Sequence, residues 1–406
     1  MKNFKRSFPI YVALLIFTGF GFLWVAQSVE AEGTVATASI GVGATVVLTP
    51  TIDNFDDGND LNLWGGPMGT VPDASIVRTY DDVIKHGTTG RSLKLTYNMA
   101  IAGEGYGAFF VKVGPAGPGG DGQVNITADR QLTFWIRGAV GGVEHLKIQL
   151  TNASSEAGGR KRAHVYVHDY LDGGITTGWQ PVHIPLDAFA NLSSLSNVTE
   201  ITFVFEKSYV ELPGSGFAMS GSVYIDDVAI TADPLTALRI DHFGDGWGWG
   251  ALGGNQGSFG TSTLTYDPAT FFGAARSLRS VYNVSATPPG NPDFAGHFFI
   301  LGGEASGWTP TPVNVSRYRY LRLRARANSA TENPENLRLE VLSAAGQANL
   351  AIVGLTTGWQ QFIFDMNAIP GTLDKTTVRQ ISIVYLRGVS TDQSGVVYFD
   401  DIEFSE

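Results

Sequence analysis

The chain carries the same series of short motifs twice, about 180 residues apart. The segment GSVYIDDVAI at 221–230 returns as GVVYFDDIEF at 395–404. Four further pairs keep the same order: IDNFDDG (52–58) with IDHFGDG (240–246), GRSLKLTYNM (90–99) with ARSLRSVYNV (275–284), GAFFVKVG (107–114) with GHFFILGG (296–303), and TTGWQPVHIPL (176–186) with TTGWQQFIFDM (356–366). A period this long indicates a duplicated domain and not a short-repeat solenoid.

The duplication sets the expected domain boundaries. The 406 residues are too many for one typical domain and comfortable for two. We expect one module at 50–232 and a second at 238–406, because Pro234 in the joint TADPLTAL (231–238) breaks a strand.

The N-terminus indicates export. Lys2, Lys5 and Arg6 precede an apolar stretch at 9–26, and the small residues of VEA follow at 29–31. This is typical of a signal peptide over 1–31, with a spacer at 32–49. The apolar stretch is long enough to serve instead as an uncleaved membrane anchor. The small-residue site directly after it favours cleavage, so a secreted or cell-surface protein is expected.

Composition excludes several classes of protein. The net charge of −11 leaves no basic stripe for nucleic acid. The chain has no cysteine, which excludes disulfides and cysteine–metal sites. The 50 glycines and 18 prolines, with only 16% charged residues, predict short strands and many turns.

The apolar residues alternate with polar ones at a period of two. In LTFWIRG (132–138), Leu132, Phe134 and Ile136 share one face. YLRLRARA (320–327) behaves in the same way. Half-buried strands at short spacing predict an all-β fold made of two tandem antiparallel jelly-roll β-sandwiches.

Each module brings acidic residues together at its first and last strands. If Val228 and Ile230 face the core, Asp226 shares their face. Two unpaired buried carboxylates are costly, and a divalent cation would offset that cost, with calcium favoured by oxygen ligands. The candidate ligands are Asp53, Asp226, Asp227, Asp241, Asp400 and Asp401, with Asp57 and Asp245 as flanking oxygens. Alternatively, these aspartates cap turns or accept backbone N–H bonds, and a strand bulge would turn Asp226 outward.

A ligand would bind on an outer sheet face. In RAHVYVHDY (162–170), His164, Tyr166 and His168 alternate with apolar residues and are expected to face outward together. With Trp135, Arg137 and Gln149 they would line a groove, because aromatic rings stack on sugars and polar side chains bind hydroxyls. The alternatives are an ordinary solvated strand face, or zinc binding by the histidines.

The remaining aromatic candidates lie in loops and corners. Trp64, Trp247 and Trp249 lie in glycine-rich loops and are either loop anchors or a sugar platform. The second module presents outward arginines, Arg324 among them, where the first has Trp135, which indicates different ligands. Trp179 and Trp359, in the repeated TTGW, are expected to be core corner residues.

Catalysis has little support. No G-x-S-x-G nucleophile motif is present, and the glycine-rich runs lack the Lys-Ser/Thr of a phosphate-binding loop. The paired acids recur in both copies, which indicates an architectural role and not that of a glycosidase pair. No catalytic residue is therefore assigned.

The quoted segments resemble a known family. IDNFDDGNDLNLWGGPMG, GRSLKLTYNM, TTGWQPVHIPLDAF and VYIDDVAI look like bacterial carbohydrate-binding modules of the galactose-binding-like jelly-roll group, close to family 11. The resemblance covers both repeats. It implies a structural calcium, held by Asp53 with Asp226 and by Asp241 with Asp400, and a β-glucan groove on the concave sheet that includes Trp135, His164 and Tyr166.

The function expected from all of this is non-catalytic binding of an extracellular polysaccharide by two tandem modules. Modules of this kind usually accompany a catalytic domain, and the sequence shows none. The alternatives are a structural or adhesive surface protein that binds other proteins, and a glycan-degrading enzyme.

Overall fold

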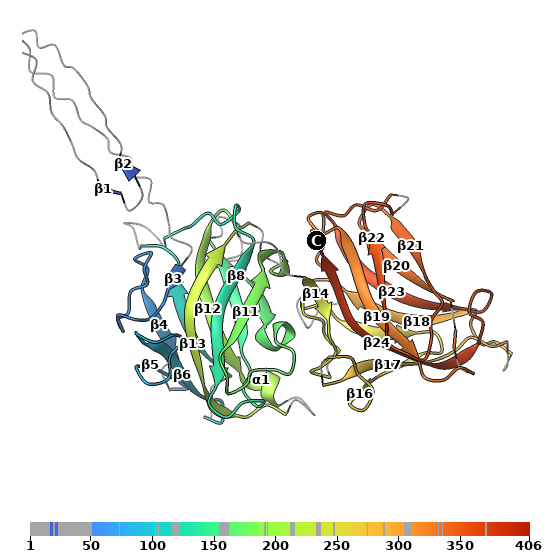
Figure 1. The fold of residues 1–406 in the computed structure, drawn as a ribbon, viewed down its shortest axis with the longest axis horizontal. Coiled ribbons are helices and arrows are strands. Elements are labelled where there is room, and N and C mark those ends of the chain that lie inside the picture. Colours follow the sequence, from blue (N-terminus) through green and yellow to red (C-terminus); the bar gives the residue numbers. More distant parts are fainter. Residues whose placement is uncertain are drawn as a thin grey trace, which may run out of the picture. The chain divides into compact units, whose positions relative to one another are not determined.

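The computed structural model describes most of residues 51–406 (Figure 1). The gaps are 73, 102, 104, 116–121, 154–161, 191, 193, 212–215, 233–236, 247, 274, 287–288, 304–309, 332, 335 and 370–371. Residues 1–47 and 48–406 form separate compact units. In the first, β1 (Phe17–Thr18) pairs with β2 (Gly21–Phe22), and the rest of the expected signal peptide and spacer lies outside the described residues. Within the described part, no helix has the length and apolarity to cross a membrane.

The first sandwich consists of two antiparallel sheets. The first, called the Phe110 sheet, contains β4 (Met68–Val71), β7 (Tyr106–Lys112), β9 (Lys147–Asn152), β10 (Arg162–Tyr166) and β12 (Val198–Glu206), in the order β10-β9-β12-β7-β4. The second, called the Trp135 sheet, contains β3 (Thr51–Asp53), β5 (Ile76–Asp81), β6 (Ser92–Asn98), β8 (Gln131–Gly138), β11 (Gln180–Pro185) and β13 (Ser220–Thr231). Its order is β11-β8-β13-β6-β5, with β3 paired to β13. Three short helices, η1 (Val167–Tyr170), η2 (Leu186–Ala188) and α1 (Lys207–Val210), connect strands.

The second sandwich repeats this plan. The sheet called the Phe298 sheet contains β15 (Gln256–Phe259), β18 (Phe294–Ile300), β20 (Asn336–Ser343), β21 (Gln347–Val353) and β23 (Val378–Leu386). The sheet called the Arg324 sheet contains β14 (Leu238–Asp241), β16 (Thr263–Asp267), β17 (Ser277–Asn283), β19 (Tyr320–Ala327), β22 (Gln360–Asp365) and β24 (Ser394–Ser405). The strand orders correspond to those of the first sandwich. The predicted all-β class with two tandem sandwiches is therefore confirmed. Most successive strands cross between the two sheets, as in a jelly roll, while pairs such as β5 and β6 stay in one sheet.

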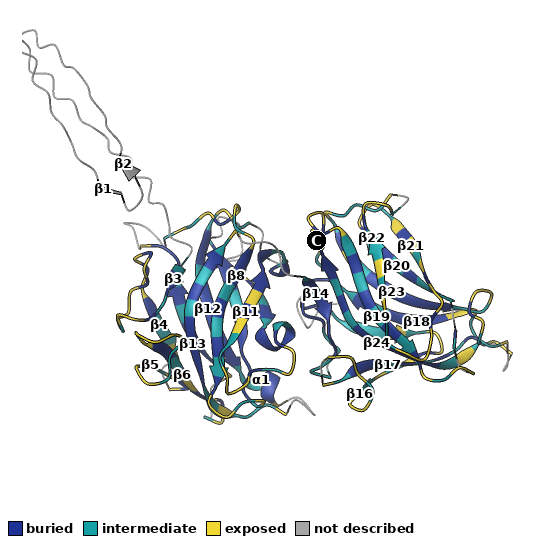
Figure 2. Cartoon of the chain, viewed as in Figure 1, coloured by how far each residue is buried: buried dark blue, intermediate teal, exposed yellow. Residues whose placement is uncertain are grey.

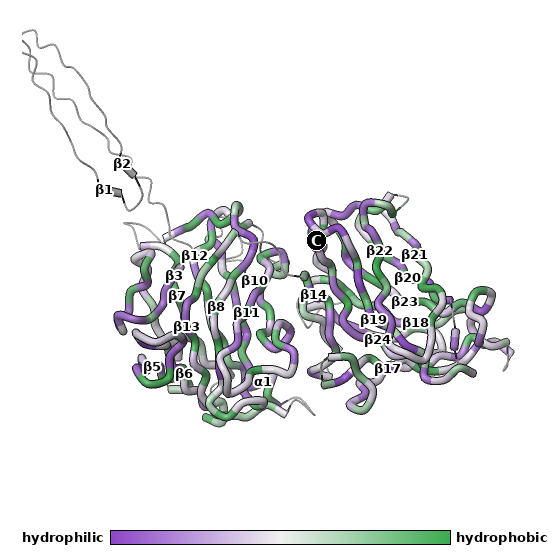
Figure 3. Tube along the Cα trace, in the orientation of Figure 1, coloured by the Kyte–Doolittle hydropathy of each residue, from purple (hydrophilic) through white to green (hydrophobic). Residues whose placement is uncertain are grey.

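The core of each sandwich lies between its two sheets. Along β8, Leu132, Phe134 and Ile136 are buried and alternate with half-exposed residues, as predicted. Figure 2 shows the same alternation of buried and more exposed positions along other strands, and Figure 3 shows apolar and polar residues interleaved along the chain. Each sandwich can therefore bury one face of every central strand and present the other face outward.

The first and last strands of each sandwich are neighbours. Asp53 of β3 lies opposite Val228 of β13, and Asp241 of β14 lies opposite Ile402 of β24. The predicted adjacency of the terminal strands is thus confirmed in both copies.

A β-bulge interrupts the alternation of inward and outward side chains in the last strand of each sandwich, β13 and β24. In β13 the pairing with β8 shifts between Asp226 and Ala229, and Asp227 has a left-handed φ of 50°. Val223 and Ile225 are buried before this bulge, so Asp226 lies on the face opposite to theirs. The expectation that Asp226 shares the face of Val228 and Ile230 is therefore wrong.

The same bulge recurs in the second sandwich. Asp401 has a left-handed φ of 45°, and Phe399 before it and Ile402 after it are both buried. Asp400 therefore does not share the face of Ile402, contrary to expectation. Both Asp226 and Asp400 are nevertheless almost completely buried, because a loop covers each of them.

One of the matched motif pairs is out of register by one residue. β7 and β18 have identical burial patterns, which align Phe110 with Phe298 and Phe109 with His297. The identical letters of GAFFVKVG and GHFFILGG would instead align Phe109 with Phe298. The structural register is the correct one, because Gly69 pairs with Phe110 and Gly257 pairs with Phe298 in the neighbouring strands.

This register reveals a polar cluster inside the second core. His297, Ser280 and Tyr385 occupy the places of Phe109, Leu95 and Phe205 in the first sandwich. The Ser280 hydroxyl lies 2.5 Å from His297 Nε2 and 2.6 Å from the Tyr385 hydroxyl. Burial lowers the pKa of His297 from 6.5 to about 3, so this imidazole is neutral in the folded protein.

Acidification is expected to destabilise the second sandwich through His297. Below pH 6.5 the imidazole of His297 becomes protonated in the unfolded chain, whereas in the folded protein it stays neutral until the pH approaches 3. The contribution of neutral His297 to the free energy of unfolding is therefore complete above pH 6.5. It is lost as the pH falls toward 3, by up to about 1.4 kcal/mol per pH unit. Urea unfolding of the full chain at several pH values should show a shallower pH slope for H297Q than for the native protein. H183Q, at an exposed histidine, is the control, and an unchanged slope in H297Q would contradict the prediction.

Candidate functional site

One row of outward side chains crosses the whole Phe110 sheet. In register across its five strands lie His164, Gln149, Thr202, Phe110 and Gly69. These five residues are called the Phe110 row. Because neighbouring strands are about 4.8 Å apart, the four steps between them span roughly 19 Å. The row is therefore long enough to contact several rings of an extended polymer.

The aromatic ring of the row lies flat on the sheet. A Cβ atom built on Gly69 would stand 2.7 Å from Cζ of Phe110, so the ring covers the glycine in the adjacent strand. Phe110 is half-exposed. The absence of a side chain at position 69 lets one ring face rest on the backbone while the other faces outward.

The second sandwich contains the same row. Gly257, Phe298, Ser382, Glu340 and Asn349 lie in register across the Phe298 sheet; they are called the Phe298 row. A Cβ atom on Gly257 would stand 2.6 Å from Cζ of Phe298. A flat aromatic ring followed by hydroxyl and amide or carboxylate groups is thus common to both copies.

The floor of the first row is shielded and uncharged. Thr202 points outward but is only 5% exposed. Burial, with a smaller effect from the Lys147 charge, lowers the pKa of His164 to about 4, so its ring is neutral at neutral pH and can both donate and accept hydrogen bonds. In the second row, Glu340 carries a charge that is paired with Arg338 at 2.5 Å.

Ion pairs flank the first row. Lys112 and Glu200 pair at 2.7 Å on one side, and Lys147 pairs with Glu206 on the other. Because each charge is matched, the face presents an aromatic ring and polar groups with little net field. Such a combination suits the apolar faces and hydroxyl groups of neutral sugars.

The structure brings together only part of the predicted groove. Gln149 and His164 lie side by side in the Phe110 row, and Tyr166 lies one row away, stacked on Tyr209 at a ring distance of 4.3 Å. Trp135 and Arg137 belong to the other sheet. The expectation of one groove containing all of them is wrong, because the outer faces of the two sheets of a sandwich point in opposite directions.

A loop covers the outer face around Trp135. The His86 ring stacks on Trp135 at 3.8 Å, and Trp179 meets His86 edge-on at 5.9 Å. His86 Nδ1 lies 3.0 Å from Asp227 Oδ2. Arg137 lies over the Tyr224 ring of the same sheet.

The second sandwich has an equivalent arrangement. The Arg324 guanidinium lies 3.6 Å above the Phe272 ring, its Nε donates to Asp401 at 3.2 Å, and Trp359 meets Phe272 edge-on. Asp227 and Asp401 are therefore occupied by pairing on this outer side. Trp179 and Trp359 are half-exposed, so the expectation that they are core corner residues is wrong.

Several other candidates lie away from the rows. Strand β10 ends at Tyr166, so His168 falls in helix η1 and is buried. The expectation that His168 faces outward together with His164 is therefore wrong. Trp64 is buried in the first core. Trp249 is half-buried and bridges to Asn255, and Trp247 lies outside the described residues.

The acidic site of the first sandwich has an unused oxygen. Asp53 Oδ1 accepts the Phe55 N–H at 2.6 Å, while Oδ2 is buried and has no hydrogen-bond partner among the described residues. Burial raises the pKa of Asp53 to about 7 and that of Asp226 to about 7. The neighbouring Asp56 is exposed, and its carboxylate accepts the Arg91 N–H at 3.1 Å and the Asn54 side-chain N–H at 2.8 Å. Among the described residues, oxygens of Asp53, Asp56 and Asp226 do not gather within 4.8 Å of one another. The orphaned Asp53 oxygen is therefore the feature of this site that favours a hard cation.

In the second sandwich the oxygen equivalent to the unpartnered Asp53 oxygen has a hydrogen-bond donor. Gln256 donates its side-chain N–H to Asp241 Oδ2, and Gln256 stands in the strand position that Met68 occupies in the first sandwich. Gly244 stands where the first sandwich has Asp56. With its spare oxygen bonded and one acid missing, the Asp241 site does not fit a cation.

Asp226 and Asp400 have the same structural role. Asp226 accepts the N–H of His86 at 3.0 Å and that of Asp227 at 2.9 Å. Asp400 accepts the N–H of Phe272 at 2.8 Å and that of Asp401 at 3.0 Å. The alternative reading, in which these aspartates accept backbone N–H bonds, therefore holds for both.

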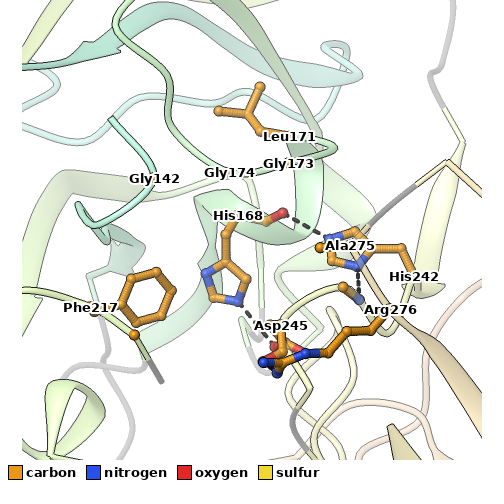
Figure 4. A pocket seen from close by; sticks show the side chains of 12 residues that line it. Gly142, His168, Leu171, Gly173, Gly174, Phe217, His242, Asp245, Ala275 and Arg276 are labelled. Carbon is orange, nitrogen blue, oxygen red and sulfur yellow. Dashed lines mark hydrogen bonds and ion pairs between the residues drawn. The ribbon is translucent and has the colours of Figure 1, made fainter. Parts of the chain in front are cut away.

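A separate buried group could hold a metal ion. One ligand atom each of His168, Asp169 and Asp245 lies within 4.8 Å of the others, and Figure 4 shows His168 and Asp245 facing each other. Sequence reasoning grouped Asp245 with the second acidic site and missed Asp169. The contact joins the two repeats, and no local motif indicates it.

Sequence reasoning also missed Phe110 and Phe298. The repeated Phe-Phe pair was a usable signal, but the choice of the outward ring depends on a register that the letters misalign. The glycine opposite each ring is visible only once the strands are paired.

Residues 116–232 match the family described as carbohydrate binding domain 30. A comparison with curated proteins gives no match.

Similar solved structures include two single carbohydrate-binding modules and one tandem pair of modules. A family 30 module of a cellulosomal cellulase from Clostridium thermocellum is 20% identical, covers 41% of this chain and 86% of its own, and has a TM-score of 0.31. A family 11 module from Clostridium thermocellum, in complex with a β-1,3-1,4-mixed-linked tetrasaccharide, is 14% identical over 45% of this chain and 94% of its own, with a TM-score of 0.30. The tandem CBM22-1-CBM22-2 domain of Paenibacillus barcinonensis Xyn10C is 12% identical over 87% of this chain and 96% of its own, with a TM-score of 0.31. With the family match at 116–232, the expected resemblance to carbohydrate-binding modules is confirmed.

Proposed function

We propose that the chain is an exported, non-catalytic polysaccharide-binding protein whose sugar-binding faces are the Phe110 row and the Phe298 row. The observation that carries this proposal is the flat, glycine-backed aromatic ring at the head of a polar row in both sandwiches. The match of residues 116–232 to carbohydrate binding domain 30 supports carbohydrate as the ligand class.

The chemistry of the first row favours a neutral polysaccharide of the β-glucan type. A pyranose ring stacks one apolar face on Phe110, and its hydroxyls then reach the polar groups of Thr202 and Gln149 in the next two strands. No formal charge lies in the row, because burial keeps His164 neutral. An acidic polymer would therefore gain nothing here over a neutral one.

The two rows are not identical. Glu340 replaces Gln149, and Asn349 replaces His164. The second sandwich therefore prefers different hydroxyl patterns or linkages. Two modules on one chain raise the local concentration of the second for the same polymer, provided that both rows can reach it.

The acids support a binding role more than a catalytic one. Asp226 and Asp400 each hold two backbone N–H groups, so neither is free to transfer protons to a substrate. We extend the proposal to a structural calcium in the first sandwich only, bound at the unpartnered Oδ2 atom of Asp53.

Replacement of the ring should weaken polysaccharide binding. F110A removes the stacking surface and is expected to cost about 1–1.5 kcal/mol, or roughly five- to tenfold in Kd. Isothermal titration of the full chain with soluble mixed-linked β-glucan, after a panel of polysaccharides tested by affinity electrophoresis, measures this. W135A is the matched control, because Trp135 is also half-exposed but lies on the opposite sheet.

G69A sharpens the test, because it keeps the ring but lifts it from the sheet through the 2.7 Å clash. Binding should weaken while Phe110 remains present. Unchanged binding in F110A together with a loss in W135A would place the ligand on the other sheet. Failure of the whole panel to bind the native chain would remove the proposed function.

Removal of calcium should destabilise the first sandwich alone. At a calcium concentration 100-fold above Kd, binding stabilises by about 2.7 kcal/mol, which corresponds to about 5–10 °C in Tm for a sandwich of this size. Calorimetry of the full chain with and without a chelator measures the shift.

Three variants test where the calcium effect arises. D53N should abolish the shift, whereas D241N should leave it unchanged because Gln256 already bonds that carboxylate. M68Q copies the second sandwich and should also make stability independent of calcium. A shift that survives D53N, or no shift in the native chain, would refute the calcium site.

A further inference from the structure

One imidazole nitrogen faces two carboxylates in the buried group of His168, Asp169 and Asp245. His168 Nε2 lies 3.4 Å from Asp169 Oδ1 and 3.2 Å from Asp245 Oδ2. The Tyr209 hydroxyl is 2.7 Å from the same nitrogen. A neutral imidazole can place at most one hydrogen on this nitrogen, so one N–H faces three oxygen atoms.

The spacing of these atoms matches a tetrahedral cation site. With ligand bonds of about 2.0–2.1 Å, two ligands of a tetrahedral zinc ion are about 3.3–3.4 Å apart. The two distances measured from His168 Nε2 are close to this value. All three ligand atoms lie within 4.8 Å of one another, so small side-chain movements would close the remaining gap.

Asp169 supplies a second, independent indication. Its side chain is 8% exposed, yet among the described residues no N–H or O–H group donates a hydrogen bond to its carboxylate. Its carboxylate forms an ion pair with His168 Nε2 at 3.4 Å. A buried carboxylate without a donor costs free energy unless another positive charge is close.

The nearby arginines are directed mainly at other groups. Arg239 pairs with Asp172 at 2.7 Å and also donates to the Asp169 carbonyl oxygen. Arg276 donates to the Asp245 carbonyl oxygen. They lower the local negative charge without donating to either carboxylate of the group.

A solvent-accessible pocket adjoins the group. It has a volume of about 230 Å³ and is lined by His168, Asp245, Phe217, His242 and Arg276, among others. Figure 4 shows His168 and Asp245 meeting at its wall, with the Phe217 ring on the other side of His168. A cation and a water molecule can therefore enter, and the water can fill the fourth position.

We propose that His168, Asp169 and Asp245 bind a divalent transition-metal ion of the zinc class, which ties the two sandwiches together. His168 and Asp169 follow β10 in the first sandwich, and Asp245 follows β14 in the second. The imidazole nitrogen selects zinc over calcium, because calcium takes oxygen ligands at longer distances. This site is distinct from the rows and from the acidic site at Asp53.

Metal titration of the full chain tests the proposal. After treatment with a chelator and dialysis, zinc chloride is titrated calorimetrically, and cobalt(II) is added separately to follow the visible absorption of a tetrahedral site. We expect D245N, from the second sandwich, and H168Q, from the first, each to weaken zinc binding at this site at least tenfold. Both should lose the tetrahedral cobalt spectrum.

D172N is the matched control, because Asp172 lies in the same region and pairs with Arg239 but is not part of the group. It should bind zinc and cobalt like the native chain. Far-UV circular dichroism verifies folding, and D169N replaces H168Q if that variant is unfolded. The proposal is overturned if the native chain binds neither ion, or if D245N binds them as D172N does.

Discussion

A buried carboxylate that accepts two backbone N–H groups organises each sandwich. Asp226 binds the N–H of the next residue, at the bulge, and that of His86 in a distant loop. Without these donors a buried carboxylate would cost several kcal/mol. The pairing therefore fixes both the left-handed turn in the last strand and the loop that lies over the sheet. Asp400 repeats it with Phe272.

This constraint decides which outer face is open. The loop that donates to Asp226 stacks His86 on Trp135. The loop that donates to Asp400 places the Phe272 ring against the Arg324 guanidinium. One sheet of each sandwich is thus partly covered by the chain itself. The opposite sheet keeps a flat ring and a polar row facing outward, and for this reason the proposed binding face lies there and not beside the tryptophans.

The sequence was sufficient for the duplication, the all-β class and the adjacency of the terminal strands, because repeats and period-two alternation are local signals. It failed where one residue changes the face of a strand. The bulge at Asp227 reversed the side of Asp226, and the one-residue shift between Phe109 and Phe298 hid the outward ring. The assignment of Trp135 and His164 to one groove failed because sheet membership depends on pairing between distant strands.

The two copies show how a fixed frame allows its interior to diverge. A polar side chain is tolerated inside the second core because Ser280, His297 and Tyr385 contact one another there. Likewise, the amide of Gln256 satisfies the oxygen that Asp53 leaves open in the first copy. In both cases the new polar group finds at least one partner inside the sandwich, so these positions differ between the copies while the strand pairing stays intact. The rows differ in a similar way: Glu340 of the second row pairs with Arg338, and the position equivalent to Arg338 in the first sandwich is also a cation, Lys147.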